Sequence, residues 1–302
     1  MALDKTLIVV VGPTAIGKTS LAISLARHFN TEILSADSRQ FFKEMEIGTA
    51  KPSVEELAAA PHHFINSHSI DTLFNTGDFE LQAIDLLEAL FKKHKLLIMV
   101  GGSGLYIDAV CNGLDDLPET DLKIREMLNL QFAADGLESI KQQLIEYDPE
   151  YYNKVDQSNP QRMIRGLEFF LSTGKKLSSY QTNSKKVRPF NILKIGLNMD
   201  RVELYNRINQ RVDDMMQAGL LEEVKDLQPY RKYNALNTVG YSELFSYLDG
   251  DITLKEAVDQ IKQNTRRFAK RQLTWFRRDD SIAWFEPGQN NTVIDYISQK
   301  TN

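Results

Sequence analysis

The chain has 302 residues, of which 42% are hydrophobic and 25% charged, and its formal net charge is −5 at pH 7. These values fit a globular protein with one large and one smaller domain, and they argue against a surface that is basic throughout for binding nucleic acid. No apolar run approaches the roughly 20 residues that span a bilayer, and the N-terminal MALDKTLIVV lacks a secretory pattern, so we expect a cytoplasmic protein without a membrane segment. The single cysteine, Cys111, excludes an internal disulfide and a cysteine-rich zinc site.

A phosphate-binding loop follows the first predicted strand. Residues 6–11 are an apolar run typical of a buried strand, GPTAIGKTS (12–20) comes directly after it, and a helix is predicted over 18–29. The segment meets the spacing G-x-x-x-x-G-K-[ST], in which glycines let backbone amides turn toward an anion. Lys18 adds a point charge, and the hydroxyl of Thr19 can bind Mg²⁺. The motif leaves open whether the bound phosphates are those of a nucleotide or of some other diphosphate. We expect them to be bound by Gly12, Pro13, Thr14, Ala15, Ile16, Gly17, Lys18 and Thr19.

Strands and helices alternate along most of the remaining chain. This alternation predicts an α/β fold in which a P-loop NTPase-like parallel sheet is flanked by helices on both faces. Between residues 117 and 189 the pattern changes to helices only, which predicts an all-helical insertion domain (117–189) in a core formed by 1–116 and 190–302. The other predicted strands are 32–36, 96–100 and 191–199, and the other predicted core helices are 78–93, 104–111, 201–217 and 254–278.

One helix of the insertion has clear boundaries in the sequence. Asn159 is typical of a helix cap, Pro160 fits the first turn, and Gly174 is typical of the residue that ends a helix. Arg162 and Arg165 are three residues apart within this helix, so we expect them to share a face.

A carboxylate follows the strand predicted over 32–36. Asp37 stands directly after that strand, whereas the strand over 96–100 leads into Gly101-Gly102-Ser103-Gly104, which has no carboxylate. Sheets of this class hold their chemistry at the carboxyl ends of the strands. The pattern alone leaves two roles open for Asp37: an acid linked to a metal in a kinase, or a general base beside a diphosphate.

A strongly basic segment, RRFAKRQLTWFRR (266–278), contains six basic residues and no acidic one. On a helix its basic side chains fall within an arc of about 140°, while Phe268, Ala269, Leu273, Trp275 and Phe276 fill the other side. Such a face is either a solvated outer surface or a stripe that follows a polyanion backbone. The absence of any carboxylate favours the second interpretation, with Arg271 and Arg277 as phosphate contacts.

Six segments resemble, in the same order, those of bacterial tRNA dimethylallyltransferases. The resemblance covers nearly the whole chain and implies a P-loop kinase-like fold whose helical insertion grips the anticodon stem-loop of tRNA. It also implies transfer of a dimethylallyl group from its diphosphate to the exocyclic amine of the adenine 3′ to the anticodon, in tRNAs that read codons beginning with U. The segments are ADSRQFFKEMEIGTAKPS (36–53), APHHFI (60–65), VGGSGLYI (100–107), NPQRMIRGLE (159–168), VGYSEL (239–244) and TRRFAKRQLTWFRR (265–278).

The resemblance implies roles for individual residues. Lys18, with Mg²⁺ on Thr19, would stabilise the leaving diphosphate, and Asp37 would accept the proton of the adenine amine. Ser103 stands where the family usually has threonine and would keep a hydroxyl near the reacting centre, and Arg125 would donate to the diphosphate or the substrate. The implied tRNA contacts are Asp37, Ser38, Arg39, Gln40, Gln161, Arg162, Met163, Ile164 and Arg165.

Three other functions remain as alternatives at this stage: a P-loop small-molecule kinase, an isopentenyltransferase that acts on free adenine nucleotides, and an RNA-binding protein without catalysis. The basic 266–278 segment and the missing carboxylate after 96–100 speak against a metabolite kinase, and the intact phosphate loop speaks against a simple RNA-binding protein. His62, His63 and His68 lack the spacing of metal ligands and are expected to be loop residues. No obligate protein partner is indicated.

Overall fold

The computed structural model describes residues 4–182 and 184–301. The chain divides into two compact units, one formed by Met1–Asn112 and Val187–Asn302 and the other by Gly113–Lys186. The sequence placed the edges of the helical insertion at 117 and 189, a few residues later than the edges of the second unit. In the part of the chain that the structure describes, no helix is long and apolar enough to cross a membrane.

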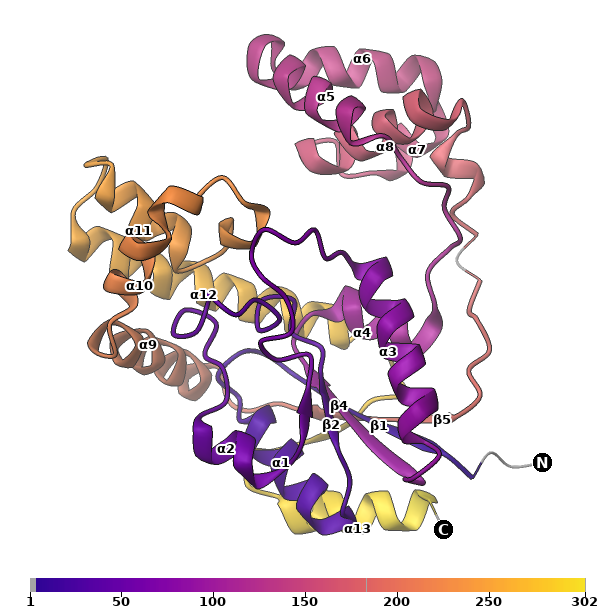
Figure 1. Cartoon of the computed structure of the whole chain (residues 1–302), viewed down its shortest axis with the longest axis vertical. Coiled ribbons are helices and arrows are strands. Elements are labelled where there is room, and N and C mark those ends of the chain that lie inside the picture. Colours follow the sequence, from indigo (N-terminus) through magenta and orange to yellow (C-terminus); the bar gives the residue numbers. More distant parts are fainter. Residues whose placement is uncertain (1–3, 183, 302) are drawn as a thin grey trace. The chain divides into compact units, whose positions relative to one another are not determined.

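The first unit is built on a parallel sheet of six strands, which confirms the predicted α/β class. Its strands lie in the order β3-β2-β4-β1-β5-β6, and Figure 1 shows the helices around them. The strands are β1 (Thr6–Val11), β2 (Ile33–Ser35), β3 (His62–His63), β4 (Leu96–Gly101), β5 (Asn191–Leu197) and β6 (Ala283–Phe285).

Successive residues of β1 point to opposite faces of this sheet, and both faces are covered. Leu7, Val9 and Val11 belong to a core cluster with residues of α3 and α4, whereas Ile8 and Val10 pack with residues of α1, α9 and α13. Burial on both faces explains why the strand reads as an uninterrupted apolar run. The helices of this unit are α1 (Lys18–Phe29), α2 (Val54–Ala59), α3 (Thr76–Leu90), α4 (Gly104–Asn112), α9 (Arg201–Gln217), α10 (Leu220–Leu227), α11 (Tyr241–Leu248), α12 (Leu254–Phe276) and α13 (Asn290–Thr301).

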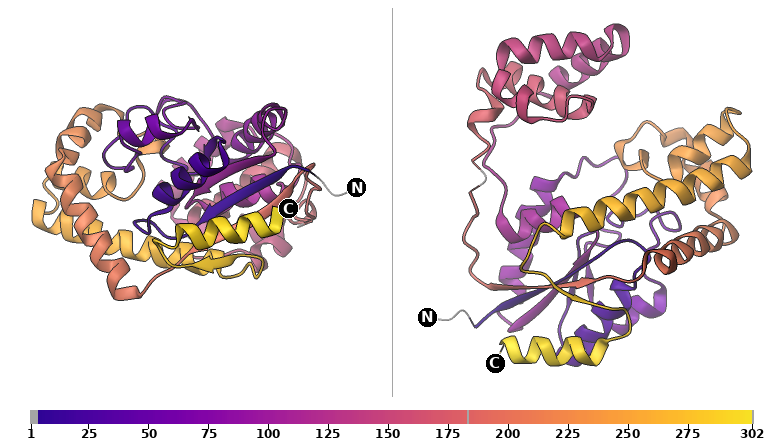
Figure 2. Two further views of the ribbon diagram at one scale, coloured as in Figure 1. Left: turned by 90° about the horizontal axis from the view of Figure 1, so that it is seen from below. Right: turned by 180° about the vertical axis from the view of Figure 1, so that it is seen from behind.

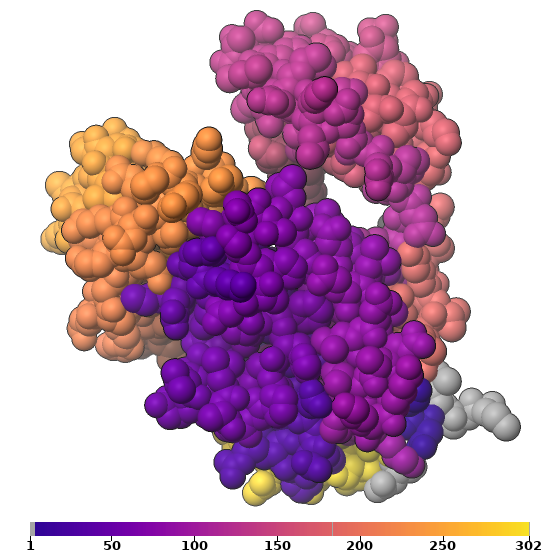
Figure 3. Space-filling view, viewed as in Figure 1, coloured from indigo at the N-terminus to yellow at the C-terminus, as the bar shows by residue number. Residues whose placement is uncertain are grey.

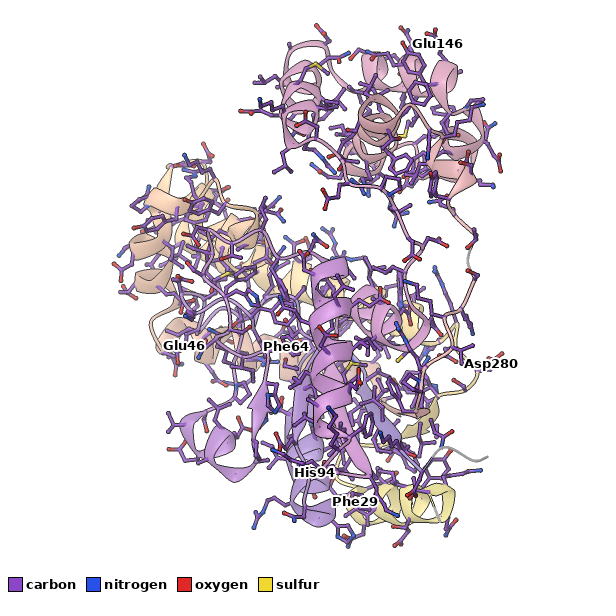
Figure 4. All side chains as sticks on the ribbon, turned by 45° about the vertical axis from the view of Figure 1, so that its right-hand side comes forward. Phe29, Glu46, Phe64, His94, Glu146 and Asp280 are labelled. Carbon is purple, nitrogen blue, oxygen red and sulfur yellow. The ribbon has the colours of Figure 1, made fainter. Side chains whose placement is uncertain are left out.

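Aromatic residues dominate the core beside α3. Phe64, labelled in Figure 4, packs its ring against Phe79 of α3 with the centroids 5.0 Å apart, and Phe41 stacks on the same ring at 5.3 Å. Phe41 is fully buried and follows the acceptor loop, defined here as Asp37–Gln40. The aromatic cluster therefore fixes the chain directly after that loop.

A further core cluster joins the ends of α9 and α12 to α10 and α11. Tyr241 and Leu244 of α11 are fully buried in it, together with Met45 from the segment after β2. Figure 3 shows orange residues packed against purple ones, and the amide of Ile47 donates to Glu223 of α10 at 2.7 Å. This packing connects the C-terminal third of the unit to the loops at the carboxyl end of the sheet.

Several predicted boundaries were wrong for identifiable reasons. The helix predicted over 78–93 is α3, which begins at Thr76 because the side chain of Asn75 accepts hydrogen bonds from the amides of Gly77 and Asp78. The helix predicted over 254–278 ends at Phe276. His62 and His63, expected in a loop, form the short strand β3.

Among the described residues of the second unit (113–182 and 184–186), every regular element is helical, as the sequence pattern predicted. Asn159 caps α8 by accepting from the amide of Arg162 at 3.2 Å, and Gly174 ends that helix with φ 68°, so both predicted boundaries are confirmed. Its helices, with one 3-10 turn (η1), are α5 (Leu122–Asp135), α6 (Leu137–Tyr147), α7 (Pro149–Lys154), α8 (Pro160–Thr173) and η1 (Leu177–Ser179).

Candidate active site

Three loops leave the sheet side by side at its carboxyl edge. The last residue of β1, Val11, pairs with Gly101 of β4, and Val100 pairs with Ser35 of β2. The phosphate loop, the acceptor loop and the 101–104 loop therefore begin at adjacent points, where open α/β sheets hold their ligands.

Two glycines allow the phosphate loop to take its shape. Gly12 has φ 147°, and a Cβ atom there would lie 2.8 Å from the carbonyl oxygen of Leu197 in β5. Gly17 has φ 100° and forms the left-handed cap of α1. Ile16 is buried and anchors the loop in the core cluster that contains α1. The loop thus presents the amino end of α1, which attracts anions.

The side chain of Lys18 is half-buried at the centre of this site. Its ammonium group donates to the carbonyl oxygen of Pro13 at 2.8 Å, within the same loop. Burial lowers the pKa of Lys18 to about 7, with Asp37 opposing and Arg211 adding to that shift. A bound anion would favour the charged form, because it replaces the solvation that burial removes.

Arg211 of α9 is a cation of this site that the sequence reasoning missed. Its Nη1 donates to the hydroxyl of Thr14 at 3.2 Å, and its Nη2 donates to the carbonyl of Ala50 at 3.5 Å. Burial lowers the pKa of its guanidinium, which Asp37 counteracts. Arg211 belongs to no recognisable motif, so only the fold brings it to the phosphate loop.

The acceptor loop holds its carboxylate by a local turn. Oδ1 of Asp37 accepts a hydrogen bond from the amide of Arg39 at 3.0 Å. Gln40, expected to contact tRNA, donates instead to the carbonyl oxygens of Thr49 at 3.3 Å and Ala50 at 3.2 Å, and accepts from the hydroxyl of Ser35. In this structure Gln40 fastens the acceptor loop to the segment after it.

Arg39 points from the acceptor loop toward the segment before α11. Its guanidinium donates to the carbonyl oxygens of Asn234 and Asn237, at 3.3 Å each, and burial lowers its pKa. Both asparagines also line an open cavity of about 370 Å³, to which Lys232 and Tyr233 contribute. Arg39 therefore connects the acceptor loop to two residues that line this hollow.

Ser103 joins the 101–104 loop to the acceptor loop. Its Oγ accepts from the amide of Ser38 at 3.1 Å and donates to the hydroxyl of Ser38 at 3.2 Å. The two loops come very close, since a Cβ atom at Gly101 would lie 2.3 Å from the carbonyl oxygen of Ala36. This contact places both predicted site residues, Ser38 and Ser103, at one point.

The basic segment of α12 differs from the simple stripe predicted from the sequence. Lys270, Arg271 and Arg277 are exposed, as expected for a basic face. Phe268 was placed on the packed side but is 39% exposed, and its ring lies 5.7 Å from the guanidinium of Arg271. Arg266 was assigned to the stripe but donates to Oδ1 of Asn209 in α9, so it braces two helices.

A buried carboxylate organises the predicted residues of the second unit. Glu168 is 2% exposed and accepts from Arg125 at 2.8 Å and from Arg165 at 3.0 Å. Nη1 of Arg125 also donates to Oε1 of Gln161 at 3.4 Å. Sequence reasoning missed Glu168 as the common partner of the two arginines, although the three-residue spacing of Arg165 and Glu168 on α8 offered a signal.

Two predicted tRNA contacts in this unit are corrected by their burial. The side chains of Met163 and Ile164 are fully buried in the core cluster of α5 to α8, because their positions on α8 face inward. Arg162, by contrast, is exposed. The α8 surface is thus polar and basic, and its apolar side chains support it from beneath.

The structure also locates the histidines and the sole cysteine. Glu32 accepts a hydrogen bond from His63 at 2.7 Å and another from His94, labelled in Figure 4, at 3.2 Å. Among the described residues, no group of three or more histidine, cysteine or acidic side chains is arranged to hold a metal ion. Cys111 is buried, and burial raises the pKa of its thiol to about 12.

Comparison with known proteins identifies the family. A family model described as IPP transferase matches residues 40–279. A tRNA dimethylallyltransferase of Christiangramia forsetii is 56% identical over 297 residues, covering 98% of this chain and 98% of that protein. A tRNA dimethylallyltransferase of Cytophaga hutchinsonii is 50% identical and covers 99% of this chain and 98% of its own.

Solved structures agree with this assignment. The tRNA isopentenylpyrophosphate transferase of Bacillus halodurans is 36% identical with a TM-score of 0.72, covering 98% of this chain and 97% of that chain. A eukaryotic dimethylallyltransferase solved in the course of acting on tRNA is 27% identical with a TM-score of 0.80, covering 98% of this chain and 80% of its own. The chain belongs to the IPP transferase family, the tRNA dimethylallyltransferases.

Proposed function

We propose that the chain is a tRNA dimethylallyltransferase. It transfers the dimethylallyl group of dimethylallyl diphosphate to the exocyclic amine of the adenine 3′ to the anticodon, in tRNAs that read codons beginning with U. One observation carries the proposal: a phosphate loop and a carboxylate, that of Asp37, meet at the same edge of the sheet, where the charge of Asp37 opposes the fall in the pKa of Lys18. The names of its relatives carry the same activity.

The phosphate loop binds the donor through its diphosphate. As the bond between the allylic carbon and oxygen breaks, the diphosphate leaves with the electron pair and its negative charge grows. The backbone amides of the loop supply fixed dipoles, and Lys18 and Arg211 supply positive charges, beside the place where this negative charge develops. Groups arranged in this way before the reaction usually make the largest single contribution to lowering its activation free energy. Because the amide of Thr14 is already bonded to Gln272, the later amides of the loop are the ones that face the anion.

Thr19 fits a magnesium ion shared with the donor. Mg²⁺ is usually bound by one or two protein oxygens together with substrate phosphates and water, so a cluster of carboxylates is not required. Thr19 supplies such an oxygen in the first turn of α1. When bound there, the ion would neutralise charge on the diphosphate.

Asp37 serves the acceptor. The exocyclic nitrogen of adenine forms the new bond to the allylic carbon and must lose a proton, which passes to the carboxylate. The hydrogen bond from the Arg39 amide to Oδ1 fixes the carboxylate and leaves Oδ2 for this proton. Ser103, through Ser38, keeps the acceptor loop against the 101–104 loop.

The tRNA is held by polar and basic surfaces of both units. In the first unit these are the acceptor loop, the hollow beside Arg39 and the exposed arginines of α12. In the second unit they are Arg125, Gln161 and Arg165, gathered by Glu168, with exposed Arg162 on the same helix. An adenine in an anticodon loop can be unstacked at a cost of a few kcal/mol and read by such contacts.

The runner-up function is transfer to a free adenine nucleotide. Radiolabelled dimethylallyl diphosphate and Mg²⁺ are incubated with the protein and either unmodified tRNA, AMP or ATP. We expect label in tRNA alone. Label in AMP or ATP would replace the proposal with the free-nucleotide reaction, and ATP turnover stimulated by tRNA would revive the kinase-like interpretation.

A further inference from the structure

Gln272 lies on the inner side of α12 and contacts two of the three functional loops. Its Oε1 accepts a hydrogen bond from the amide of Thr14 at 2.8 Å, and its Nε2 donates to the carbonyl of Gly102 at 2.9 Å. The side chain is only 6% exposed. One amide group thus bridges the phosphate loop and the 101–104 loop and satisfies a donor and an acceptor at the same time.

The 101–104 loop is shaped to receive α12 on both sides of Ser103. A Cβ atom at Gly102 would lie 2.2 Å from Nε2 of Gln272, and one at Gly104 would lie 2.4 Å from the indole ring of Trp275. Nε1 of Trp275 in turn donates to Oδ2 of Asp108 at 2.9 Å. Since Gln272 and Trp275 are three residues apart on one helix, they share a face and enclose the loop that carries Ser103.

These contacts connect the donor and acceptor sides of the site. The backbone amide of Thr14 donates a hydrogen bond to Gln272, and its hydroxyl accepts one from the guanidinium of Arg211. Thr14 is therefore held through both its backbone and its side chain. Gln272 also fixes Gly102, and the next residue, Ser103, holds Ser38 of the acceptor loop. Gln272 therefore ties the phosphate loop to the 101–104 loop and, through Ser103, to the loop that carries Asp37.

On this basis, and resting on the proposed transferase function, we propose that Gln272 is a positioning residue for the transfer reaction. It touches neither the donor nor the base, and it sets the spacing of the two loops that hold them. A small error in that spacing lowers the rate of a reaction between two bound groups, by up to about 100-fold for 1 Å. Arg271 lies on the exposed basic face of the same helix and takes no part in this contact.

The test compares Gln272→Met with Gln263→Met, an exposed glutamine changed on the same helix. The kcat and the donor KM are measured at saturating tRNA, the tRNA Kd is measured separately, and folding is checked by thermal denaturation. We expect Gln272→Met to lower kcat/KM for dimethylallyl diphosphate about 10- to 100-fold with the tRNA Kd within twofold of wild type, and Gln263→Met to change none of these. Values of kcat and donor KM within twofold of wild type in folded Gln272→Met would overturn the proposal, as would a fall that parallels lost tRNA affinity.

A second variant, Gln272→Glu, adds a pH profile of activity, with folding checked by thermal denaturation at each pH. A carboxylate can accept from Thr14 but cannot donate to Gly102, whereas the protonated acid can do both. The activity of Gln272→Glu relative to wild type should therefore rise as the pH falls from 8 to 6. If Gln272→Met does not fold, this pH profile tests the positioning role of Gln272 in its place. A flat ratio would reject the positioning role, whereas wild-type protein that transfers no label at all would reject the proposed function instead.

Discussion

The hydroxyl of Tyr241 in α11 donates a hydrogen bond of 2.5 Å to the carboxylate of Glu223 in α10. The pKa of Tyr241 is raised, chiefly by burial and then by the charge of Glu223, so the phenol stays protonated and keeps donating. A Cβ atom at Gly48 would lie 2.5 Å from the ring of Tyr241, so the loop passes directly over it. Tyr241 and Glu223 therefore support the segment around Gly48, which follows the acceptor loop.

Glu223 also accepts from three consecutive backbone amides of that segment, at 3.0, 2.7 and 3.0 Å, those of Glu46, Ile47 and Gly48. Glu223→Ala would leave these amides without their acceptor. Each amide that water does not reach would then lower the free energy of unfolding by about 1–3 kcal/mol. We expect a lower melting temperature and a lower kcat, because Gln40 and Arg211 both bond to Ala50 in the same segment. Glu222→Ala, at the exposed neighbouring position, is the control, and equal melting temperatures for the two variants would contradict the expected role.

The charge of Lys18 gives a pH dependence that can be measured without substrate. Its pKa in the folded protein is about 7, against an ordinary value of 10.5. Between those values the unfolded chain binds more protons, so the contribution of Lys18 to stability rises with pH and is most unfavourable below about pH 7. We expect Lys18→Met to unfold at higher denaturant concentration than wild type at pH 6, with the difference shrinking toward pH 10. A difference that grows with pH would show that the ammonium is stabilised in the ligand-free protein.

Asp37→Asn tests the general base while keeping the local turn. The amide oxygen of asparagine can still accept from the backbone N–H of Arg39, so the loop should keep its shape. Without a carboxylate, we expect kcat to fall about 10²- to 10⁴-fold and the tRNA Kd to stay close to wild type. A single-turnover rate within threefold of wild type would remove Asp37 from the mechanism.

Arg211 is tested against a second arginine of α9. Arg211→Met should weaken binding of inorganic pyrophosphate and raise the donor KM, because it removes the guanidinium that lies beside Thr14. Arg207→Met is the matched control, since Arg207 is exposed and pairs with Glu203 on the same helix. Isothermal titration with pyrophosphate and Mg²⁺ measures the difference, and equal affinities of both variants would place Arg211 outside the donor site.

The sequence was sufficient for features that depend on local spacing. The predicted strand 6–11 and helices 18–29 and 201–217 coincide with β1, α1 and α9, because long periodic segments and the glycines between them carry strong local signals. The strands β3 and β6 were not predicted, since two or three residues cannot show a period. Their pairing depends on the neighbouring strand and not on their own pattern.

The residues that the sequence did not reveal act across long stretches of chain. Gln272 and Thr14 are 258 positions apart, and Arg211 and Thr14 are 197 apart. Within a basic helix, a single glutamine is indistinguishable from a solvated one until its neighbours are known. The opposite error was made for Met163 and Ile164, whose side chains were expected to contact tRNA but are buried. A family motif does not say which of its side chains face the core.

The two exposed arginines of the α12 end, Arg271 and Arg277, are tested by their effect on the salt dependence of tRNA binding. If they lie along phosphates, changing both to alanine should weaken all tRNAs alike and reduce the slope of log affinity against log salt by up to about two units, because fewer counterions are released. Lys92→Ala with Lys93→Ala removes the same charge from exposed positions before β4, at the opposite edge of the sheet from the candidate site, and should leave the slope unchanged. Titrations at four salt concentrations with one cognate and one non-cognate anticodon stem-loop decide the question. An Arg271/Arg277 slope equal to that of the lysine control would mean that this face of α12 is an ordinary solvated surface.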